Sequence, residues 1–429
     1  MLTGDRPLRV ALLGAGTVGR EVARALLERG ARLGTLGGVA MTVVGIAVRD
    51  PDRAVSGGLP ATLITDAPAH LVAGETTDVV IEVMGGEEPA FTLIAAALGA
   101  GKPVVTANKH VVAHHGPELE ALARRTGAAL RFEAAVGGGI PILSPLASDL
   151  AANEIRRVRG IVNGTTNVIL TEMADEGRRY EEALAEAQAA GYAEADPTGD
   201  VEGDDAVNKL VILARLAFGE WIDPASVTRC PPTVRGTGRP GITGITDREI
   251  EGAEALGYTI RLMATAARTA DGAIAASVVP TCVAANSPFG FTTGTTNRIE
   301  IDAEPVGTIR IAGPGAGGPE TSSAILADLL GVARGLGSTW GALPPAGVSA
   351  DGHIAAADAL AGPRHWYAWL PALDLASTTL PTALDEAAAV DFEDGTAIRS
   401  EHVSLAEARS AFATILPPDV DVTLYPCED

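Results

Sequence analysis

The sequence is poor in basic residues, cysteines, aromatic side chains and long hydrophobic runs, and each shortage excludes a class of protein. Its 429 residues carry 32 lysines and arginines against 54 aspartates and glutamates, a formal net charge of −22. No long block of positive charge offsets this excess, so neither nucleic acid nor an anionic lipid surface is an expected partner. The excess of acid is expected to serve the solubility of the surface.

Only three cysteines occur, Cys230, Cys282 and Cys427, and they are far apart in the chain. None forms a CxxC pair or has a histidine at metal-ligand spacing, which argues against a disulfide framework and a structural zinc site and favours a reducing compartment. The N-terminus lacks the features of a secretory signal, and no stretch approaches the ~20 apolar residues of a membrane span. These absences predict a soluble cytoplasmic protein, and the length predicts two or three domains.

Short apolar runs alternate with helix-like segments along the first 150 residues. Strands that alternate with helices indicate crossover units around a parallel sheet, so residues 1–150 are predicted to form a doubly wound α/β domain. The predicted strands are 8–16, 41–48, 77–84, 102–108 and 129–136, and the predicted helices include 17–30 with its end at Gly30, 89–101 and 111–127.

The pattern changes after Ile161. Helical patterns rich in alanine and glutamate are followed by strand-like segments, which predicts an α+β domain. Residues 341–364 have the composition of a linker, and 365–429 are predicted to form a small α+β unit. The helical patterns are 166–190 and 203–219, the strand-like segments are 273–284 and 298–313, and a helix is predicted after the glycine cluster 313–318.

A glycine motif, GAGTVG, follows the first predicted strand and precedes a helix. In this context Gly14 permits a tight turn, Gly16 lets the backbone approach a pyrophosphate, and Gly19 lets the helix and strand pack closely. Thr17 and Val18 begin the helix, whose free N–H groups and dipole favour phosphate. Dinucleotide binding is therefore favoured over a merely tight strand–helix turn.

The second strand ends in Val48-Arg49-Asp50, where a residue that binds the ribose is expected. A glycine-rich loop, 31–40, is predicted to delay this strand end. Arg49 would suit a 2′-phosphate and favour NADP, whereas Asp50 would suit a free 2′-hydroxyl and favour NAD. Arg49 also fits an ordinary surface residue, so the form of the coenzyme stays open, with a preference for NADP.

Two further segments follow predicted parallel strands, at the edge where ligands of open α/β sheets bind. In TANKH, Lys109 is either a ligand of a carboxylate or carbonyl beside the nicotinamide or a solvated lysine at a strand end. In FEAAVGGGIPI (132–142), the three glycines form either a flexible connection or a turn whose carbonyls hold a hard cation. The residues by themselves leave both alternatives open.

The stretch GYAEADPTGDVEGDDAVNKL (191–210) crowds six carboxylates in front of one lysine. Lys209 follows Asp205 by four residues, so the two side chains share a face of a helix. Apolar residues surround the pair on nearly all sides, which predicts a buried helix. A buried lysine must be paired or have a lowered pKa, and either state suits proton transfer. A solvated acidic turn would explain the loop but not Lys209, so a functional site is favoured.

Together these segments resemble the homoserine dehydrogenase family over about residues 8–335. The family signature matches without a gap, and the other segments follow in the family's order. The signature residues are Ala187, Gly191, Tyr192, Ala193, Asp196, Pro197, Asp200, Val201, Gly203, Asp205 and Lys209, and the other segments are TANK (106–109), FEAAVGGGIPI (132–142), GIVNGTTN (160–167) and GPGAGG (313–318). The resemblance implies reversible, NAD(P)H-dependent reduction of L-aspartate 4-semialdehyde to L-homoserine in threonine, methionine and isoleucine biosynthesis.

The resemblance also implies a role for individual residues. Lys209 would be the acid–base lysine, Lys109 a second active-site lysine, and Asp205 the carboxylate that orients Lys209. A sodium ion would be held, mostly through carbonyls, by Glu133, Val136, Gly138 and Ile140. The substrate-binding residues would be Glu194, Asp200, Asp205, Gly164, Thr165 and Tyr192, and the coenzyme-binding residues would be Gly14, Gly16, Thr17, Val18, Gly19, Arg49, Lys109 and Gly315.

The domains that follow from the resemblance are a Rossmann-type nucleotide-binding domain (1–150, completed by about 311–340) and an α+β catalytic and dimerisation domain (151–310). Family members are usually dimers or dimer-built tetramers, so a homo-oligomer is expected. The C-terminal region, 350–429, departs from the family pattern. Its segment RHWYAWLPALDLASTTLPTALDEAAAV (364–390) lacks the Pro-Gly-Val turn of an ACT module, so regulation by threonine is left open.

Two alternatives remain at this stage. One is a paralogous dehydrogenase that acts on a related amino-acid semialdehyde, since an acidic loop would bind any α-amine. The other is a catalytically silent, nucleotide-sensing regulator. The presence of Lys109, Asp205 and Lys209 argues against the silent regulator.

Overall fold

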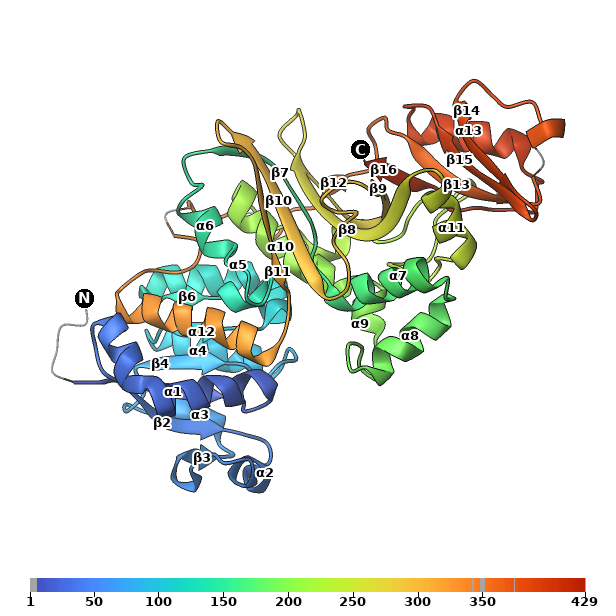
Figure 1. Cartoon of the computed structure of the whole chain (residues 1–429). Helices are drawn as coiled ribbons and strands as arrows, with labels where there is room; N and C mark the ends of the chain where they lie inside the picture. The colour runs from blue at the N-terminus through green and yellow to red at the C-terminus, as the bar shows by residue number, and fades with distance from the viewer. Residues whose placement is uncertain (1–5, 342, 348–351, 374, 429) are drawn as a thin grey trace.

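The structure is a computed structural model of the chain that describes residues 6–341, 343–347, 352–373 and 375–428. Figure 1 shows a helix-covered sheet built from the N-terminal residues at one end and a second, longer sheet that extends to the C-terminal region at the other. Part of the predicted linker 341–364 lies outside the described residues. Within the described part of the chain, no helix has the length and apolarity needed to cross a bilayer.

The first sheet has six parallel strands in the order β3-β2-β1-β4-β5-β6. The chain order reverses beside β1, and such a switch point is where open α/β sheets bind their ligands. The predicted doubly wound sheet is therefore confirmed. Its strands are β1 (Leu8–Leu13), β2 (Met41–Ala47), β3 (Ile64–Thr65), β4 (Val79–Glu82), β5 (Val104–Thr106) and β6 (Leu130–Arg131).

Helices cover both faces of this sheet, and one of them comes from far along the chain. The helix predicted after the second glycine cluster, α12 (Gly318–Ala333), lies beside the first helix, α1 (Thr17–Gly37), with Leu329 and Leu26 in one apolar cluster. The other helices of this part are α2 (Pro51–Ser56), α3 (Pro68–Ala73), α4 (Ala90–Gly99), α5 (Lys109–Thr126) and the short α6 (Leu143–Ala147).

The predicted end of α1 is wrong. Gly30 lies inside the helix, which continues to Gly37 and ends at Gly38 with a φ of +77°, so most of the predicted loop 31–40 is helical. A glycine inside a helix costs only about 1 kcal/mol, and packing can offset that cost. At Gly37 the packing is tight, since a Cβ would lie 3.1 Å from the Cβ of Ala333 on α12.

The second sheet is mixed and runs in the order β11-β10-β7-β8-β9-β16-β13-β15-β14, with β12 paired to β9. Its strands are β7 (Glu154–Ile161), β8 (Tyr258–Arg268), β9 (Ile274–Ala284), β10 (Thr296–Glu304), β11 (Gly307–Pro314), β12 (Ala357–Asp358), β13 (Trp366–Pro371), β14 (Leu384–Phe392), β15 (Gly395–Ser400) and β16 (Tyr425–Glu428). The accompanying helices are α7 (Gly164–Glu176), α8 (Tyr180–Ala189), α9 (Thr198–Val201), α10 (Asp204–Phe218), α11 (Asp247–Ala255) and α13 (Leu405–Ile415).

The C-terminal residues have the α+β content that the sequence predicts, but they do not form a detached appendage. The last strand, β16, pairs in parallel with β9, where Cys427 lies opposite Cys282, and antiparallel with β13. One sheet therefore runs from β11 at one edge into the C-terminal unit. The sequence does not show this pairing because it joins strands more than 140 residues apart.

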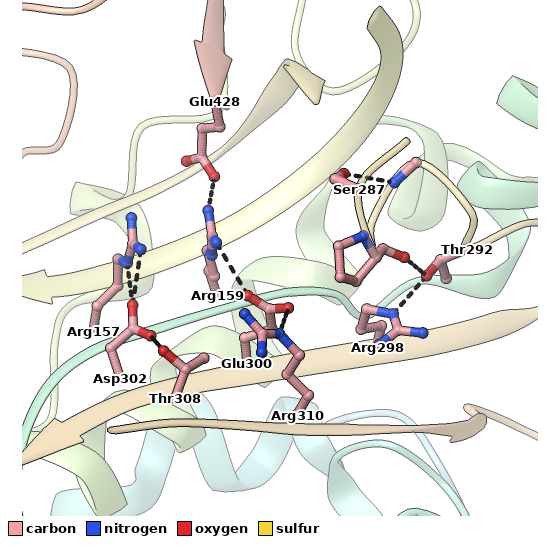
Figure 2. Close-up of polar contacts among 12 residues, drawn as sticks. Arg157, Arg159, Ser287, Thr292, Arg298, Glu300, Asp302, Thr308, Arg310 and Glu428 are labelled. Carbon is pink, nitrogen blue, oxygen red and sulfur yellow. Dashed lines mark hydrogen bonds and ion pairs between the residues drawn. The ribbon is translucent and has the colours of Figure 1, made fainter. Parts of the chain in front are cut away.

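Figure 2 shows rows of charged side chains across β7, β10 and β11. Glu300, which is 1% exposed, accepts from Arg159 at 3.0 Å and from Arg310 at 2.7 Å, and all three are direct cross-strand partners. Arg159 also pairs with Glu428 of β16, so this row links the last strand to the sheet. A second row is formed by Arg157, Asp302 and Thr308.

Candidate active site

The helix α10 is buried on nearly all sides, as its sequence predicts. Gly203, the residue before it, has a φ of +90°, which lets the chain turn from the acidic loop directly into the helix. Asp204 and Asp205 fall in the first turn, where the helix dipole stabilises negative charge. Lys209 lies one turn further on and is only 8% exposed.

Two oxygen atoms hold the ammonium group of Lys209. Its Nζ donates to Oδ2 of Asp205 at 2.7 Å and to the carbonyl oxygen of Val162 at 2.6 Å. The same carbonyl accepts from Nδ2 of Asn297 at 2.9 Å, and Asn297 is fully buried. The carboxylate of Asp205 therefore balances the charge of the buried ammonium, and the two hydrogen bonds fix the position of its nitrogen.

Asp205 connects Lys209 to the second lysine of the site. Its Oδ1 lies 3.1 Å from Nζ of Lys109, the first residue of α5, whose side chain is 41% exposed. Burial by itself would raise the pKa of Asp205, but the two ammonium groups outweigh burial and hold this pKa well below its ordinary value. In return, the charge of Asp205 raises the pKa of Lys109 above its ordinary value. Both lysines therefore face a permanent negative charge.

Asn163 joins two of the acids, a role that the sequence reading missed. Its Nδ2 donates to Oδ1 of Asp200 at 2.7 Å and to Oδ2 of Asp205 at 2.8 Å. Its Oδ1 accepts from the backbone N–H of Thr166 at 2.7 Å and so caps the N-terminus of α7. An asparagine just before a predicted helix is a capping signal, and that signal would have singled Asn163 out.

A cavity of about 600 Å³ lies in front of these groups. Lys109, Glu194, Asp200 and Asp205 line it, so acids from the loop before α10 stand opposite a lysine of α5. Burial raises the pKa of Asp200, and repulsion by the charge of Asp205 raises it further. The cavity therefore combines carboxylates with the ammonium group of Lys109, an arrangement that suits a small zwitterion. Lys209 contacts Asp205 but is not itself among the residues that line the cavity.

Two histidines of α5 also line this cavity, although the sequence reading did not single them out. The rings of His110 and His114 stack with centroids 4.2 Å apart, and Nε2 of His114 lies 3.1 Å from Oδ1 of Asn208 on α10. Burial lowers the pKa of His114, so its ring is neutral near pH 7. Their positions, one and five residues after Lys109, were the available signal, because residues four apart share a helix face.

Three predicted substrate residues lie outside the lining of this cavity. Gly164 and Thr165 begin α7, directly after Asn163, and Thr165 donates through its hydroxyl to the carbonyl of Tyr192 at 2.9 Å. The Tyr192 residue is 52% exposed. The structure thus joins these three residues to one another and to Asn163, and it brings Glu194 and Asp200 rather than Tyr192 to the cavity.

The glycines of the first motif form a cradle of the shape that a pyrophosphate needs. Gly14 has a φ of +102°, and a Cβ there would lie 2.6 Å from the carbonyl oxygen of Val83. A Cβ on Gly19 would collide with the carbonyl of Gly14, so α1 packs closely on β1. A Cβ on Gly16 would meet no described atom within 4 Å, and no side chain caps the N-terminus of α1 at this residue. Free N–H groups and open space therefore coincide, which fits a dinucleotide phosphate.

The second glycine cluster returns to the same region. Gly318, the first residue of α12, lies against the start of α1, which is formed by Thr17 and Val18. A Cβ at position 318 would lie 3.1 Å from Cγ2 of Thr17. Gly315 lies against the side chain of Asn297, which would collide with a Cβ at that position. The segment therefore connects the nucleotide cradle to the residue that supports the Val162 carbonyl.

At the end of β2, the two residues offered for the ribose differ in their contacts. Asp50 directs Oδ1 to the backbone N–H of Arg53 at 3.0 Å and so caps α2. Arg49 is exposed and makes no ion pair with any described residue. One oxygen of the Asp50 carboxylate is therefore used to cap α2, whereas the guanidinium of Arg49 is available to bind a ligand.

The loop proposed for a cation follows β6. Both carboxylate oxygens of Glu133 are engaged, because they accept from the backbone N–H groups that begin α6 at 2.7–2.8 Å. In the described part of the chain, the carbonyl oxygens of Val136, Gly138 and Ile140 accept no hydrogen bond. Only carbonyl oxygens are therefore left for a cation, and such oxygens suit a hard ion.

Comparisons with known families agree with this geometry. A family model described as the NAD binding domain of homoserine dehydrogenase matches residues 14–133, and a model described as homoserine dehydrogenase matches residues 141–330. Neither match reaches the C-terminal unit.

Similar sequences and solved structures carry the same description. A homoserine dehydrogenase of Corynebacterium glutamicum is 40% identical over 400 residues, which is 92% of this chain and 82% of that protein. One of Mycobacterium tuberculosis is 42% identical over 336 residues, or 77% of this chain and 73% of that protein. The crystal structure of a homoserine dehydrogenase from Thiobacillus denitrificans is 35% identical, with a TM-score of 0.85 over 99% of both chains. A hyperthermophilic archaeal homoserine dehydrogenase in complex with NADPH is 28% identical, with a TM-score of 0.63 over 76% of this chain and 97% of that one.

Proposed function

This chain belongs to the homoserine dehydrogenase family, and on that premise we propose which of its residues carry out the reaction. It is an NAD(P)-dependent oxidoreductase that interconverts L-aspartate 4-semialdehyde and L-homoserine. The nicotinamide, when bound, supplies the hydride to the aldehyde carbon or takes it from the alcohol carbon. The observation that carries the proposal is the run Lys209–Asp205–Lys109, with distances of 2.7 and 3.1 Å, beside a cavity lined by further acids.

Lys209 is the proposed proton donor in the reduction. A hydride that arrives at an aldehyde carbon leaves negative charge on the oxygen, and a positioned ammonium both stabilises this charge and supplies the proton. Asp205 and the Val162 carbonyl hold the nitrogen in place, so little reorganisation is needed when the charge develops. In the oxidation the same nitrogen takes the proton back.

The substrate is a small zwitterion, and the cavity offers both signs of charge. Glu194 and Asp200 are proposed to hold the α-ammonium. Lys109, kept cationic by its raised pKa, is proposed to face the carboxylate or the reacting oxygen. Gly164 and Thr165, at the start of α7 where backbone N–H groups favour an anion, are proposed to contact the substrate together with Tyr192, whose carbonyl accepts from Thr165.

We also propose a preference for NADP, a monovalent cation and a homo-oligomer. Arg49 supports NADP, because it is an exposed guanidinium at the ribose end of the cradle, with no ion pair to any described residue. The carbonyl oxygens of Val136, Gly138 and Ile140 support a sodium ion. Dimers or dimer-built tetramers, and a cytoplasmic location, follow from the family resemblance.

Replacement of Lys209 by alanine tests the proton donor. General acid catalysis typically contributes about 10²–10⁴-fold, so kcat should fall by roughly that factor. The affinity for NADPH, measured by fluorescence titration, should stay within about twofold, because Lys209 is not part of the glycine cradle.

The matched control is Lys102→Ala. The ammonium of Lys102 donates to the carbonyl oxygens of Val72 and Gly74, and Lys102 does not line the cavity. This variant should lose stability but keep its kcat. Wild-type turnover in Lys209→Ala would show that another group donates the proton.

A further inference from the structure

Arg20 lies on α1, one residue beyond the last glycine of the nucleotide motif, and its guanidinium reaches the end of α2. A Cβ on Gly57, the residue after α2, would lie 3.1 Å from Cζ and from Nη2 of Arg20. Gly57 has a φ of −79°, a backbone conformation that any residue adopts. The backbone therefore does not require glycine at this position, and the room it leaves is filled by the guanidinium.

The guanidinium of Arg20 has no acceptor in the part of the chain that the structure describes. Among the described residues it makes no ion pair and no side-chain hydrogen bond, and its Nε is buried without a partner. Acids are abundant in this chain, 54 against 32 basic residues. Arg24, one turn further along the same helix, pairs with Glu21 at 3.2 Å. A buried donor without an acceptor is unfavourable, so the position becomes more favourable when a ligand supplies the acceptor.

Arg20 lies near the end of β2, where the ribose of a bound dinucleotide is expected. Arg49 ends the connection from β2, and α2 runs from Pro51 to Ser56 between Arg49 and Gly57. Figure 1 shows α2 beside β3, at the outer edge of the sheet below α1. A helix of six residues is roughly 9 Å long. The side chains of Arg49 and Arg20, at opposite ends of α2, are long enough to meet across this distance.

We propose that Arg20 and Arg49 together bind the 2′-phosphate of the adenosine ribose, so that Arg20 is a second residue that selects NADP over NAD. This inference rests on the proposed preference for NADP. A guanidinium presents a planar fork of N–H donors that matches the oxygens of a phosphate, and two such forks can neutralise a dianion. A free 2′-hydroxyl carries no charge, so NAD gains little from either arginine.

Calorimetric titration with 2′,5′-ADP and with 5′-ADP tests this without turnover of the enzyme. In Arg20→Ala the affinity for 2′,5′-ADP should fall by about tenfold or more, because one charge-assisted contact is lost, while the affinity for 5′-ADP stays within about twofold. Arg49→Ala should show the same selective loss. Arg24→Ala is the matched control, since Arg24 has its own acidic partner, and it should bind both nucleotides like the wild type.

The outcomes separate this inference from the preference on which it rests. An equal loss for both nucleotides in Arg20→Ala would mean that Arg20 only shapes the cradle, and the inference would fail. A selective loss in Arg49→Ala but not in Arg20→Ala would also overturn it, with the NADP preference intact. Equal affinity of the wild type for the two nucleotides would overturn both. Thermal unfolding of each variant checks that the cradle is folded.

Discussion

At the residue scale, the site is organised by one carboxylate that is shared among several donors. The carboxylate of Asp205 contacts the side-chain nitrogen atoms of Lys209, Lys109 and Asn163, which come from three different segments of the chain. Its charge lowers the energy of both ammonium groups and at the same time opposes the ionisation of Asp200 nearby. The sequence offered a further signal for the lysines, since the chain holds only three, Lys102, Lys109 and Lys209. Arginine stays protonated, whereas lysine can release a proton, so the two lysines of the site suit proton transfer better than arginine would.

The pH dependence of the reaction should respond to Asn163. Burial raises the pKa of Asp200 and the charge of Asp205 adds to the rise, whereas the N–H of Asn163 stabilises the carboxylate and lowers this pKa. The proposed contact of Asp200 with the substrate amine needs Asp200 ionised, so kcat/KM for homoserine should fall as the pH falls through this raised pKa. Asn163→Ala removes the stabilising bond, and the acid limb of the profile should move to higher pH.

The control for this prediction is Asn167→Ala. Asn167 lies on α7, the helix that Asn163 caps, and donates to the carbonyls of Thr292 and Gly294 instead of to the acids. It should destabilise the protein and leave the acid limb in place. An acid limb that stays fixed or moves to lower pH in Asn163→Ala would contradict the assignment of Asp200 to the substrate amine.

At the scale of single elements, the ends of helices do most of the positioning. Gly203 turns the acidic loop into α10, Asn163 caps α7, and the uncapped start of α1 leaves its N–H groups free. Helices that begin with unsatisfied N–H groups attract negative charge, so such ends suit acids and phosphates. The glycines of the first motif serve two purposes: Gly19 allows close packing of α1, and Gly16 leaves open space at the start of α1.

Two substitutions in that motif should separate these duties. Gly19→Ala inserts a Cβ that collides with the carbonyl of Gly14, so the free energy of unfolding should fall by about 1–3 kcal/mol. Gly16→Ala meets no described atom within 4 Å, so stability should change by less than about 0.5 kcal/mol. The affinity for NADPH in Gly16→Ala should nevertheless drop by about tenfold, because the methyl group occupies the phosphate's space. Thermal unfolding and fluorescence titration measure the two effects. Unchanged NADPH affinity in Gly16→Ala would argue against pyrophosphate binding at this glycine.

At the scale of the whole molecule, a buried ion pair joins the nucleotide-binding part to the catalytic helix. Arg215 of α10 is fully buried and donates to both carboxylate oxygens of Glu120 on α5, at 2.7 and 2.9 Å. Trp221 donates to the same carboxylate at 2.8 Å. Because α5 begins with Lys109 and α10 contains Lys209, this joint helps to set the spacing of the two lysines across Asp205.

Removal of Arg215 should weaken the fold strongly. Arg215→Ala leaves Glu120 buried with less compensation, so the free energy of unfolding should fall by about 3–5 kcal/mol. Arg124 pairs with the same carboxylate but is 30% exposed, so Arg124→Ala should cost about 1 kcal/mol or less. Chemical denaturation of both variants gives the comparison. Similar costs for the two would mean that burial of the pair does not control the joint.

Much of the architecture and part of the site follow from local sequence. The strand–helix alternation, the Gly14 turn and the pairing of Asp205 with Lys209 are readable because neighbours along a helix or turn are fixed by covalent geometry. Gly30 shows the limit of such reading, because a glycine ends a helix only where tertiary packing does not compensate its cost.

By itself the sequence determined the parallel sheet, the buried helix α10 and the family of the enzyme. Only the tertiary structure decided that Lys109 meets Asp205, that Asn163 bridges two acids and that Arg20 lies against Gly57. The pairing of β16 with β9 was likewise decided only by the tertiary structure. Local spacing selects neighbours within one element, whereas partners from distant segments are selected by the packing of the entire core, which no short pattern encodes.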